Sequence, residues 1–164
     1  MTQTLPEAGR AHHDRLLQTV DRMPAIGDAL LIDPPEAVRR SVDELDGFLT
    51  GTLVPHIDAA ERTLYPELER LFQNRHSMAP MRREHEEARA LVRQFTQLTS
   101  EVDLGRTTIG RTLAIRRVLF QLYALLKVHL AEEAAYLRIV DHGVTSDVGE
   151  MLAAAMDHPV VGPA

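Results

Sequence analysis

The chain has 164 residues, 45% hydrophobic and 26% charged, which suits one globular domain with one substantial core. Its net charge of −6 argues against nucleic acid or an anionic membrane as a partner, because no basic excess is present. The absence of cysteine excludes disulfides, thiolate zinc sites and iron–sulfur clusters. No apolar run approaches a membrane span, and the polar start lacks a signal-peptide core, so the expected location is the cytoplasm.

The first part of the chain predicts one helix followed by a short apolar piece. Apolar residues recur at helical spacing from about Pro6 to Met23, and Pro24 ends that pattern. The apolar piece 25–32 leads to the sequence Asp33-Pro34-Pro35. We expect a new helix to begin there, with Asp33 or a neighbour as its cap and proline in its first turn.

The second helical block is long and contains two internal prolines. It extends from about Glu36 to Asn74 and includes Pro55 and Pro66. Proline lacks the backbone N–H and its ring collides with the carbonyl group four residues earlier. Each proline is therefore expected to kink this helix or to change its winding.

Two further helices complete the predicted fold. The third block covers about 80–101 and the fourth, the most apolar, about 108–141, with a loop around Asp103-Leu104-Gly105 between them. A short extra helix is expected within 145–156. Strand signals are nearly absent, so the pattern predicts an all-α protein, an antiparallel up-down four-helix bundle. The whole chain, 1–164, then forms a single domain, with the bundle over about 8–142 and a C-terminal extension from about 145.

Histidines are distributed over all four helical blocks. The chain has eight, and each block carries at least one, namely His12 and His13, His56, His85 and His129. Imidazole binds iron, copper or zinc, and carboxylates add a preference for iron or manganese. Side chains that point inward from several helices at one level form a cage in which bundles hold metals. This distribution predicts a metal centre.

The fourth block adds a carboxylate at a suitable spacing. Glu133 follows His129 by four residues, which brings both side chains to within about 40° of each other around a helix, one turn apart. Glu133 also lies among Leu130, Ala134 and Leu137, where an unpaired carboxylate would be costly to bury. One such pair is a weak signal by itself, but together with histidines on the other helices it supports a shared metal site.

This order of residues resembles the hemerythrin-like (HHE) cation-binding family. The family pattern is His on the first helix, His-x-x-x-Glu on the second, His on the third and His-x-x-x-Glu on the fourth. The strings His13-Asp14-Arg15-Leu16 and Leu64-Tyr65-Pro66-Glu67-Leu68 are also similar, and the likeness covers about residues 8–142. The resemblance implies two irons, joined by an oxygen bridge and by carboxylates, with an open position for a small ligand. The metal ligands it implies here are His13, His56, Glu61, His85, His129 and Glu133.

The second helix departs from the family pattern. Four residues after His56 stands Ala60, and the nearest acid, Glu61, follows at the fifth position. On a regular helix Glu61 would lie about 140° from His56 and miss the metal. We hypothesise that a π-bulge next to Pro55 adds one residue to the turn and restores the alignment. Without it the site keeps one bridging carboxylate and becomes mononuclear, heterometallic or degenerate.

The remaining histidines are not predicted as ligands. In the first block His13 shares a face with Leu16 and Val20, so it is preferred to His12. A single histidine on an apolar face is more often a hydrogen-bonded core residue, and this interpretation is kept for the others. They are His12, His76, His142 and His158.

Other metal-binding classes fit less well. No glutamate stands three residues before any histidine, so the ferritin-like Glu-x-x-His pair is absent, and His85-Glu86-Glu87-Ala88-Arg89 lacks the second histidine of a zinc protease. Heme held by two histidines would leave the carboxylates unexplained. We therefore expect a non-heme di-iron protein that binds O2, NO or H2O2. The alternatives are a catalase- or peroxidase-like enzyme and a structural bundle whose site has decayed. No separate acid–base pair is evident, which favours binding over turnover.

Overall fold

The structure is a computed structural model that describes residues 5–100 and 108–141, and every regular element in these ranges is helical. The predicted all-α class is confirmed. The loop expected at 103–105 and the helix expected within 145–156 lie outside the described residues. The elements are α1 (Leu5–Val20), α2 (Met23–Ile32), α3 (Pro35–Phe48), η1 (Leu49–Leu53), α4 (Val54–Arg62), α5 (Leu64–Leu71), α6 (Ala79–Ser100) and α7 (Ile109–Asp141).

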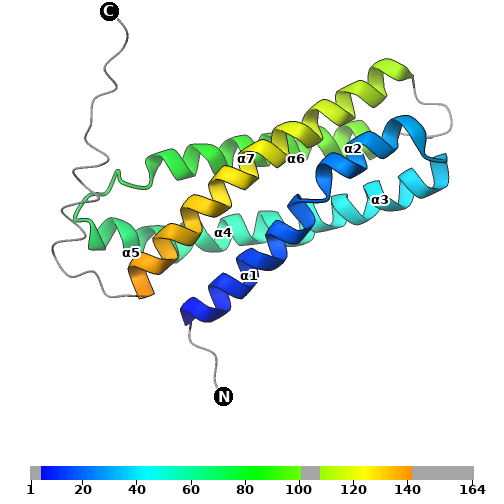
Figure 1. Ribbon diagram of the computed structural model, residues 1–164. Helices are drawn as coiled ribbons and strands as arrows, with labels where there is room; N and C mark the ends of the chain where they lie inside the picture. The colour runs from blue at the N-terminus through cyan, green and yellow to red at the C-terminus, as the bar shows by residue number, and fades with distance from the viewer. Residues whose placement is uncertain (1–4, 101–107, 142–164) are drawn as a thin grey trace, which may run out of the picture.

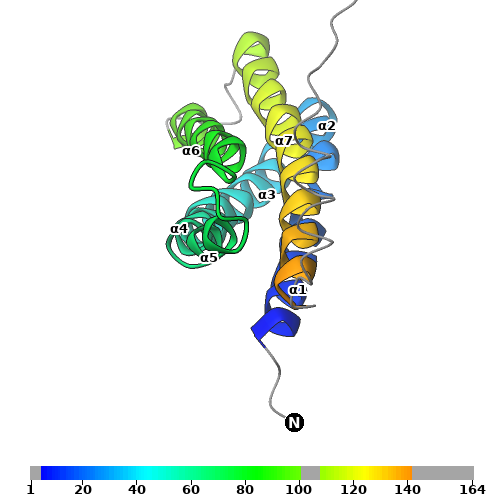
Figure 2. The ribbon, with the colours of Figure 1, turned by 90° about the vertical axis from the view of Figure 1, so that its left-hand side faces the viewer.

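The helices lie side by side in a bundle (Figure 1). The long helix α7 packs against α6 and also against α1 and α2. The segments α3, η1, α4 and α5 follow one another along a single rod, which contacts α6 through α3 and α4. From the α5 end, α6 with α4 and α5 lies on one side of the bundle, and α7 with α1 on the other (Figure 2). The interior between these two sides receives side chains from α1, α4, α6 and α7.

The first two helices differ in detail from the prediction. The first helix ends at Val20, and Pro24 stands in the first turn of α2 rather than ending a longer helix. Asp33 does not cap α3: its own backbone N–H donates to Ala29 O and closes α2. The residue before α3 is Pro34, and no side chain caps that helix. Proline in the first turn costs little, because the N–H groups there have no helical partner.

A π-helical turn, η1, precedes Pro55 in the second rod. The backbone N–H of Val54 donates to Leu49 O, five residues back, which is the π pattern. In a regular helix the Pro55 ring would collide with the carbonyl group of Gly51, and the wider turn relieves this contact. The predicted unwinding therefore exists, but its predicted position between His56 and Glu61 is wrong. Both of those residues belong to the α-helix α4.

The second proline interrupts the rod as expected. The α4 helix ends at Arg62, and Thr63 adopts φ −120° and ψ −57°, outside the helical range. Pro66 then stands in the first turn of α5. Proline cannot donate to the carbonyl group of Arg62, four residues back, so the helix breaks and restarts instead of continuing.

Two buried apolar clusters lie along the bundle. The larger runs through α1, α2, α3, η1, α4, α6 and α7 and includes Leu16, Ile57, Ala88 and Leu130. The smaller, at the α5 end, consists of Ala60, Tyr65, Leu68, Met78 and Met81. Tyr65 of the smaller cluster contacts His85, and Leu130 of the larger cluster directly follows His129 in the chain, so the candidate metal ligands adjoin both clusters. Among the described helices, none is long and apolar enough to cross a membrane.

Candidate metal centre

The predicted histidines from four helices converge in the core. His13 of α1, His85 of α6, and His129 and Glu133 of α7 are at most 3% exposed. His56 of α4 is nearly as buried, with 9% of its side chain exposed. Burial of this many ionisable groups is costly unless they bind one another or a cation. They form two groups, each of three possible ligand atoms within 4.8 Å of one another, and Glu133 belongs to both.

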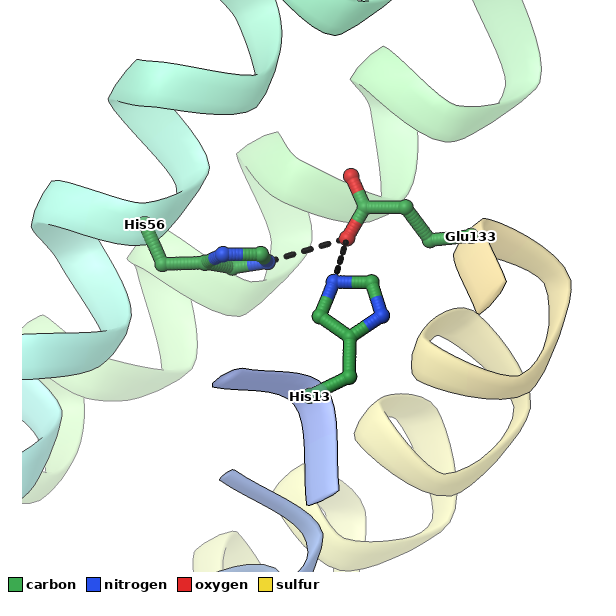
Figure 3. A group of neighbouring side chains, drawn as sticks. All are labelled: His13, His56 and Glu133. Atoms are coloured by element: carbon green, nitrogen blue, oxygen red, sulfur yellow. Dashed lines mark hydrogen bonds and ion pairs between the residues drawn. The ribbon is translucent and has the colours of Figure 1, made fainter. Parts of the chain in front are cut away.

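The first group, called here the His13–His56 position, is held together by Glu133. Its Oε2 atom lies 3.0 Å from His13 Nε2 and 2.9 Å from His56 Nε2 (Figure 3). In Figure 3 the other oxygen of this carboxylate points away from both rings. That oxygen, Oε1, is buried and has no hydrogen-bond partner within the described part of the chain.

The second group, the His85–His129 position, brings two imidazoles together with their ring planes tilted by 55°. The Nε2 atoms of His85 and His129 lie 2.9 Å apart. The Oε2 atom of Glu133 lies 4.0 Å from His129 Nε2, as expected for residues four apart on one helix. Glu133 is therefore close enough to contribute a ligand atom to a cation at either position.

Two further carboxylates hold the outer nitrogens of this second pair. His85 Nδ1 donates to Glu61 Oε1 at 2.9 Å, and His129 Nδ1 donates to Glu84 Oε2 at 2.8 Å. Arg89 in turn donates to both oxygens of Glu61, at 3.0 and 3.2 Å. Carboxylates that bind the outer nitrogen of a histidine are the usual support of metal-binding imidazoles. The sequence predicted Glu61 as a metal ligand aligned with His56. In the structure its carboxylate contacts His85 instead.

Tyr65 is the site residue that the sequence reasoning missed. It is fully buried, its ring stacks on that of His85 at 5.2 Å, and its hydroxyl group lies 3.1 Å from His85 Nε2. It belongs to the same buried cluster as Ala60, where the family pattern has the glutamate of its second helix. The only sequence signal was its place in the family-like string 64–68. Its orientation depends on the helix break at Thr63, which the sequence did not locate.

The electrostatics favour neutral rings at His85 and His129 and a charged carboxylate at Glu133. Burial raises the pKa of Glu133, but hydrogen bonds from His13 and His56 outweigh it and hold the net pKa well below its ordinary range. Burial lowers the pKa of His85 to about 4, helped by the neighbouring His129, and burial likewise lowers the pKa of His129. Burial, followed by the charge of Glu133, raises the pKa of Tyr65, so its phenol keeps its proton.

These features fit a bound cation. Because Glu61 and Glu84 accept from Nδ1, the Nε2 atoms of neutral His85 and His129 present lone pairs to each other at 2.9 Å, and a positive charge shared between them would stabilise this contact. The contacts of Glu133 with its two imidazoles, at 3.0 and 2.9 Å, are hydrogen bonds that a cation bound between the three groups would replace.

The other histidines that the structure describes stay outside both groups. His12 is half-buried, with its ring centroid 5.1 Å from that of His56, and it contributes to neither group. His76 lies on the surface, where its Nε2 atom accepts from Arg75. His142 and His158 lie outside the described residues. The preference for His13 over His12 therefore agrees with the geometry.

Comparison with known proteins identifies the family. The model of the hemerythrin HHE cation-binding domain matches residues 5–140, most of the chain. The chain therefore belongs to the hemerythrin HHE cation-binding family, a class of metal-binding helical proteins. Neither the curated proteins nor the solved structures gave a match. The family resemblance in the sequence is confirmed.

Proposed function

We propose that this protein holds two iron ions that share Glu133, and that the iron binds O2 or a related small oxidant such as NO or H2O2. The observation that carries the proposal is the place of Glu133. It is fully buried, it belongs to two groups of imidazoles, and one of its oxygens has no donor among the described residues. Histidine nitrogens combined with carboxylate oxygen suit iron.

Each residue of the centre then has a role. His13, His56, His85, His129 and Glu133 bind the metal. The Tyr65 oxygen adds a donor in the cluster where Ala60 replaces the family glutamate. Glu61 orients His85 instead of binding metal directly.

Iron in such a centre would supply reversible one-electron chemistry and a coordination position for the oxidant. The supporting residues keep the rings in place and exclude water through burial. The alternating direction of the chain along the rods in Figure 1 supports the up-down four-helix topology expected for this class.

A second candidate function is catalase-like turnover, in which two H2O2 give O2 and two H2O. The observation that favours it is the Tyr65 hydroxyl group, a proton donor within the centre that the sequence reasoning did not recognise. Turnover of peroxide needs protons at the reacting oxygens, and a buried phenol is able to deliver one. A binder should show an O2 spectrum that reverses on deoxygenation, whereas a catalase should release O2 from added H2O2.

Metal analysis of the purified protein tests the proposal. We expect about two iron ions per chain together with visible absorption from the oxidised centre. His129→Ala and Glu133→Ala should each lose most of the iron, because each removes a buried ligand. The matched control is Glu132→Gln, a change at an exposed carboxylate on the same helix that should keep the metal. Unchanged iron in either alanine variant would contradict the site.

A further inference from the structure

The two halves of the centre share Glu133 but differ in what holds their imidazoles. At the His85–His129 position, both Nδ1 atoms donate to carboxylates, at 2.9 Å to Glu61 and 2.8 Å to Glu84. At the His13–His56 position, His13 Nδ1 is buried with no hydrogen-bond partner among the described residues. The two pairs of rings therefore start from different hydrogen-bonding states.

At the His85–His129 position the rings are ready to bind a cation through Nε2. A carboxylate accepts hydrogen bonds, so Nδ1 of each ring carries the proton and Nε2 carries the lone pair. The lone pairs face each other at 2.9 Å, and Tyr65 donates its O–H to one of them. A cation that enters here needs no change of tautomer, and burial of the rings limits their rotation.

At the His13–His56 position the protons stand on the metal-facing nitrogens instead. His13 Nε2 and His56 Nε2 both donate to Glu133 Oε2, at 3.0 and 2.9 Å. Before either Nε2 binds a cation, its proton must leave or move to Nδ1. For His13 the proton would then lie on a buried nitrogen without an acceptor, which is costly.

From this difference we propose that the two metal positions are unequal. The His85–His129 position binds a divalent cation first and more tightly, and the His13–His56 position fills second. Glu61 and Glu84 are the positioning residues that set this order, because they hold the rings in the metal-binding tautomer. This inference rests on the proposed metal-binding function and specifies the order in which the centre assembles.

The two positioning carboxylates are themselves held differently. Glu61 accepts from both nitrogens of the Arg89 fork that face it, and Arg89 also donates to Asp58 at 2.7 Å. Glu84 accepts a hydrogen bond from His129, and 27% of its side chain is exposed. A variant of Glu84 therefore disturbs fewer other contacts, and it is the better probe. Loss of such a support typically lowers metal affinity about 10- to 100-fold.

Titration of the chelated, dialysed protein with Co2+, followed by calorimetry and visible absorption, tests the inference. We expect the protein to bind two equivalents of Co2+, with dissociation constants that differ by at least about tenfold. Glu84→Ala should weaken the tighter equivalent by about 10- to 100-fold and leave the weaker one nearly unchanged. Glu84→Gln, which keeps an acceptor oxygen, should lie between. The matched control is Glu87→Ala, at an exposed carboxylate on the same helix, and it should change neither equivalent.

Histidine-selective 15N NMR assigns the equivalents to positions. The first equivalent of Co2+ should shift and broaden the ring signals of His85 and His129 before those of His13 and His56. His13→Ala should remove the weaker equivalent and keep the tighter one. Glu61→Ala gives a second test of the tighter position, and circular dichroism confirms that each variant is folded.

The outcomes separate this inference from the proposed function. Two equal equivalents, a first equivalent at His13 and His56, or equal weakening of both by Glu84→Ala would each overturn the inference alone. A folded wild-type protein that binds no Co2+ and retains no iron would overturn the proposed function, and the inference with it.

Discussion

Tyr65 brings a phenolic oxygen to 3.1 Å from His85 Nε2, on the same rod in which Ala60 replaces the glutamate of the family's second helix. A phenolate oxygen is a hard ligand that suits oxidised iron, much as a carboxylate does. The nearby carboxylate of Glu133 and the burial raise the pKa of Tyr65, so a bound cation must supply the charge that releases its proton. We therefore expect Tyr65 to act as a ligand to the proposed iron.

Replacement of Tyr65 by phenylalanine tests this role. We expect Tyr65→Phe to fold, with a loss of about 1 kcal/mol because His85 Nε2 loses its donor. The oxidised, iron-loaded variant should lack the visible phenolate-to-iron absorption of the wild type. The control is Tyr136→Phe, since Tyr136 packs edge-on against Phe72. An unchanged visible spectrum in Tyr65→Phe would contradict a bond between Tyr65 and iron.

The buried imidazoles predict a pH dependence for the metal-free protein. The pKa of His85 is lowered from 6.5 to about 4 in the folded state, mainly by burial. Below pH 6.5 His85 is protonated in the unfolded chain but stays neutral in the folded chain down to about pH 4. The free energy of unfolding therefore decreases as the pH falls from 6.5 towards 4. Between pH 7 and 5 this residue alone should reduce the free energy of unfolding by about 2 kcal/mol. His129, whose pKa is also lowered, acts in the same direction.

Urea unfolding of the chelated protein at pH 7 and pH 5 measures this effect. The comparison is with His85→Gln, which lacks the titrating ring and should show a smaller decrease between the two pH values. Equal decreases in the wild type and the variant would show that His85 is not the group responsible.

At the scale of the helices, the π-helical turn η1 sets the rotation of α4 relative to α3. Val42 and Leu45 of α3 and Ile57 of α4 all face the larger buried cluster, although η1 separates them. An α-helix advances by about 100° per residue, so one residue more or less between them would turn one face away from the core. The turn therefore allows α3 to pack while His56 points at Glu133.

Deletion of Gly51 from this turn tests its role. Gly51 is exposed, and nothing lies within 4 Å of the position that its Cβ would take. We expect the deletion to remove the extra residue of the wide turn, to force the Pro55 ring against the preceding turn, to rotate α4 by about 100° and to remove His56 from the centre. The variant should lose a metal equivalent and lower the melting temperature, as measured by metal analysis and circular dichroism.

The control for this deletion is Gly51→Ala, which keeps the length of the turn. It should retain both metal equivalents and leave stability unchanged or raise it slightly, because alanine restricts the unfolded chain. A deletion variant as stable and as metal-loaded as the wild type would show that η1 has no part in placing His56.

For the whole molecule, the proposed metal centre would help to hold the bundle together. Its buried polar groups come from α1, α4, α6 and α7. A cation shared by side chains from these helices would link them, and metal that binds only the folded state stabilises it by mass action.

Removal of metal should therefore lower thermal stability. Free metal at about 100 times the dissociation constant contributes about 2.7 kcal/mol, which corresponds to roughly 5–10 °C in a domain of this size. We expect a chelator to lower the melting temperature by this amount in scanning calorimetry, and iron to restore it. His129→Ala should show no response to the chelator. A wild-type melting temperature that does not depend on the chelator would contradict a structural contribution of the metal.

Much of the fold and of the centre follows from local patterns in the sequence. Helical periodicity predicts the third block as 80–101 and the fourth as 108–141, and the helices are Ala79–Ser100 and Ile109–Asp141. The four-residue spacing of His129 and Glu133 places both in one buried centre. These features are predictable because side-chain direction along one helix depends only on position within that helix.

Contacts between helices decided the rest. The roles of Glu61, Glu84 and Tyr65 depend on how α4, α5 and α6 are rotated against one another. That rotation depends on a π-turn before Pro55 and a break at Thr63, and both are set by the packing of whole rods as well as by proline. A proline indicates that a helix must kink, widen or end nearby. Which turn is distorted depends on how the helices pack in the core. The convergence of four histidines and Glu133 could therefore be anticipated from the chain, whereas the contacts of Glu61, Glu84 and Tyr65 with these rings could not.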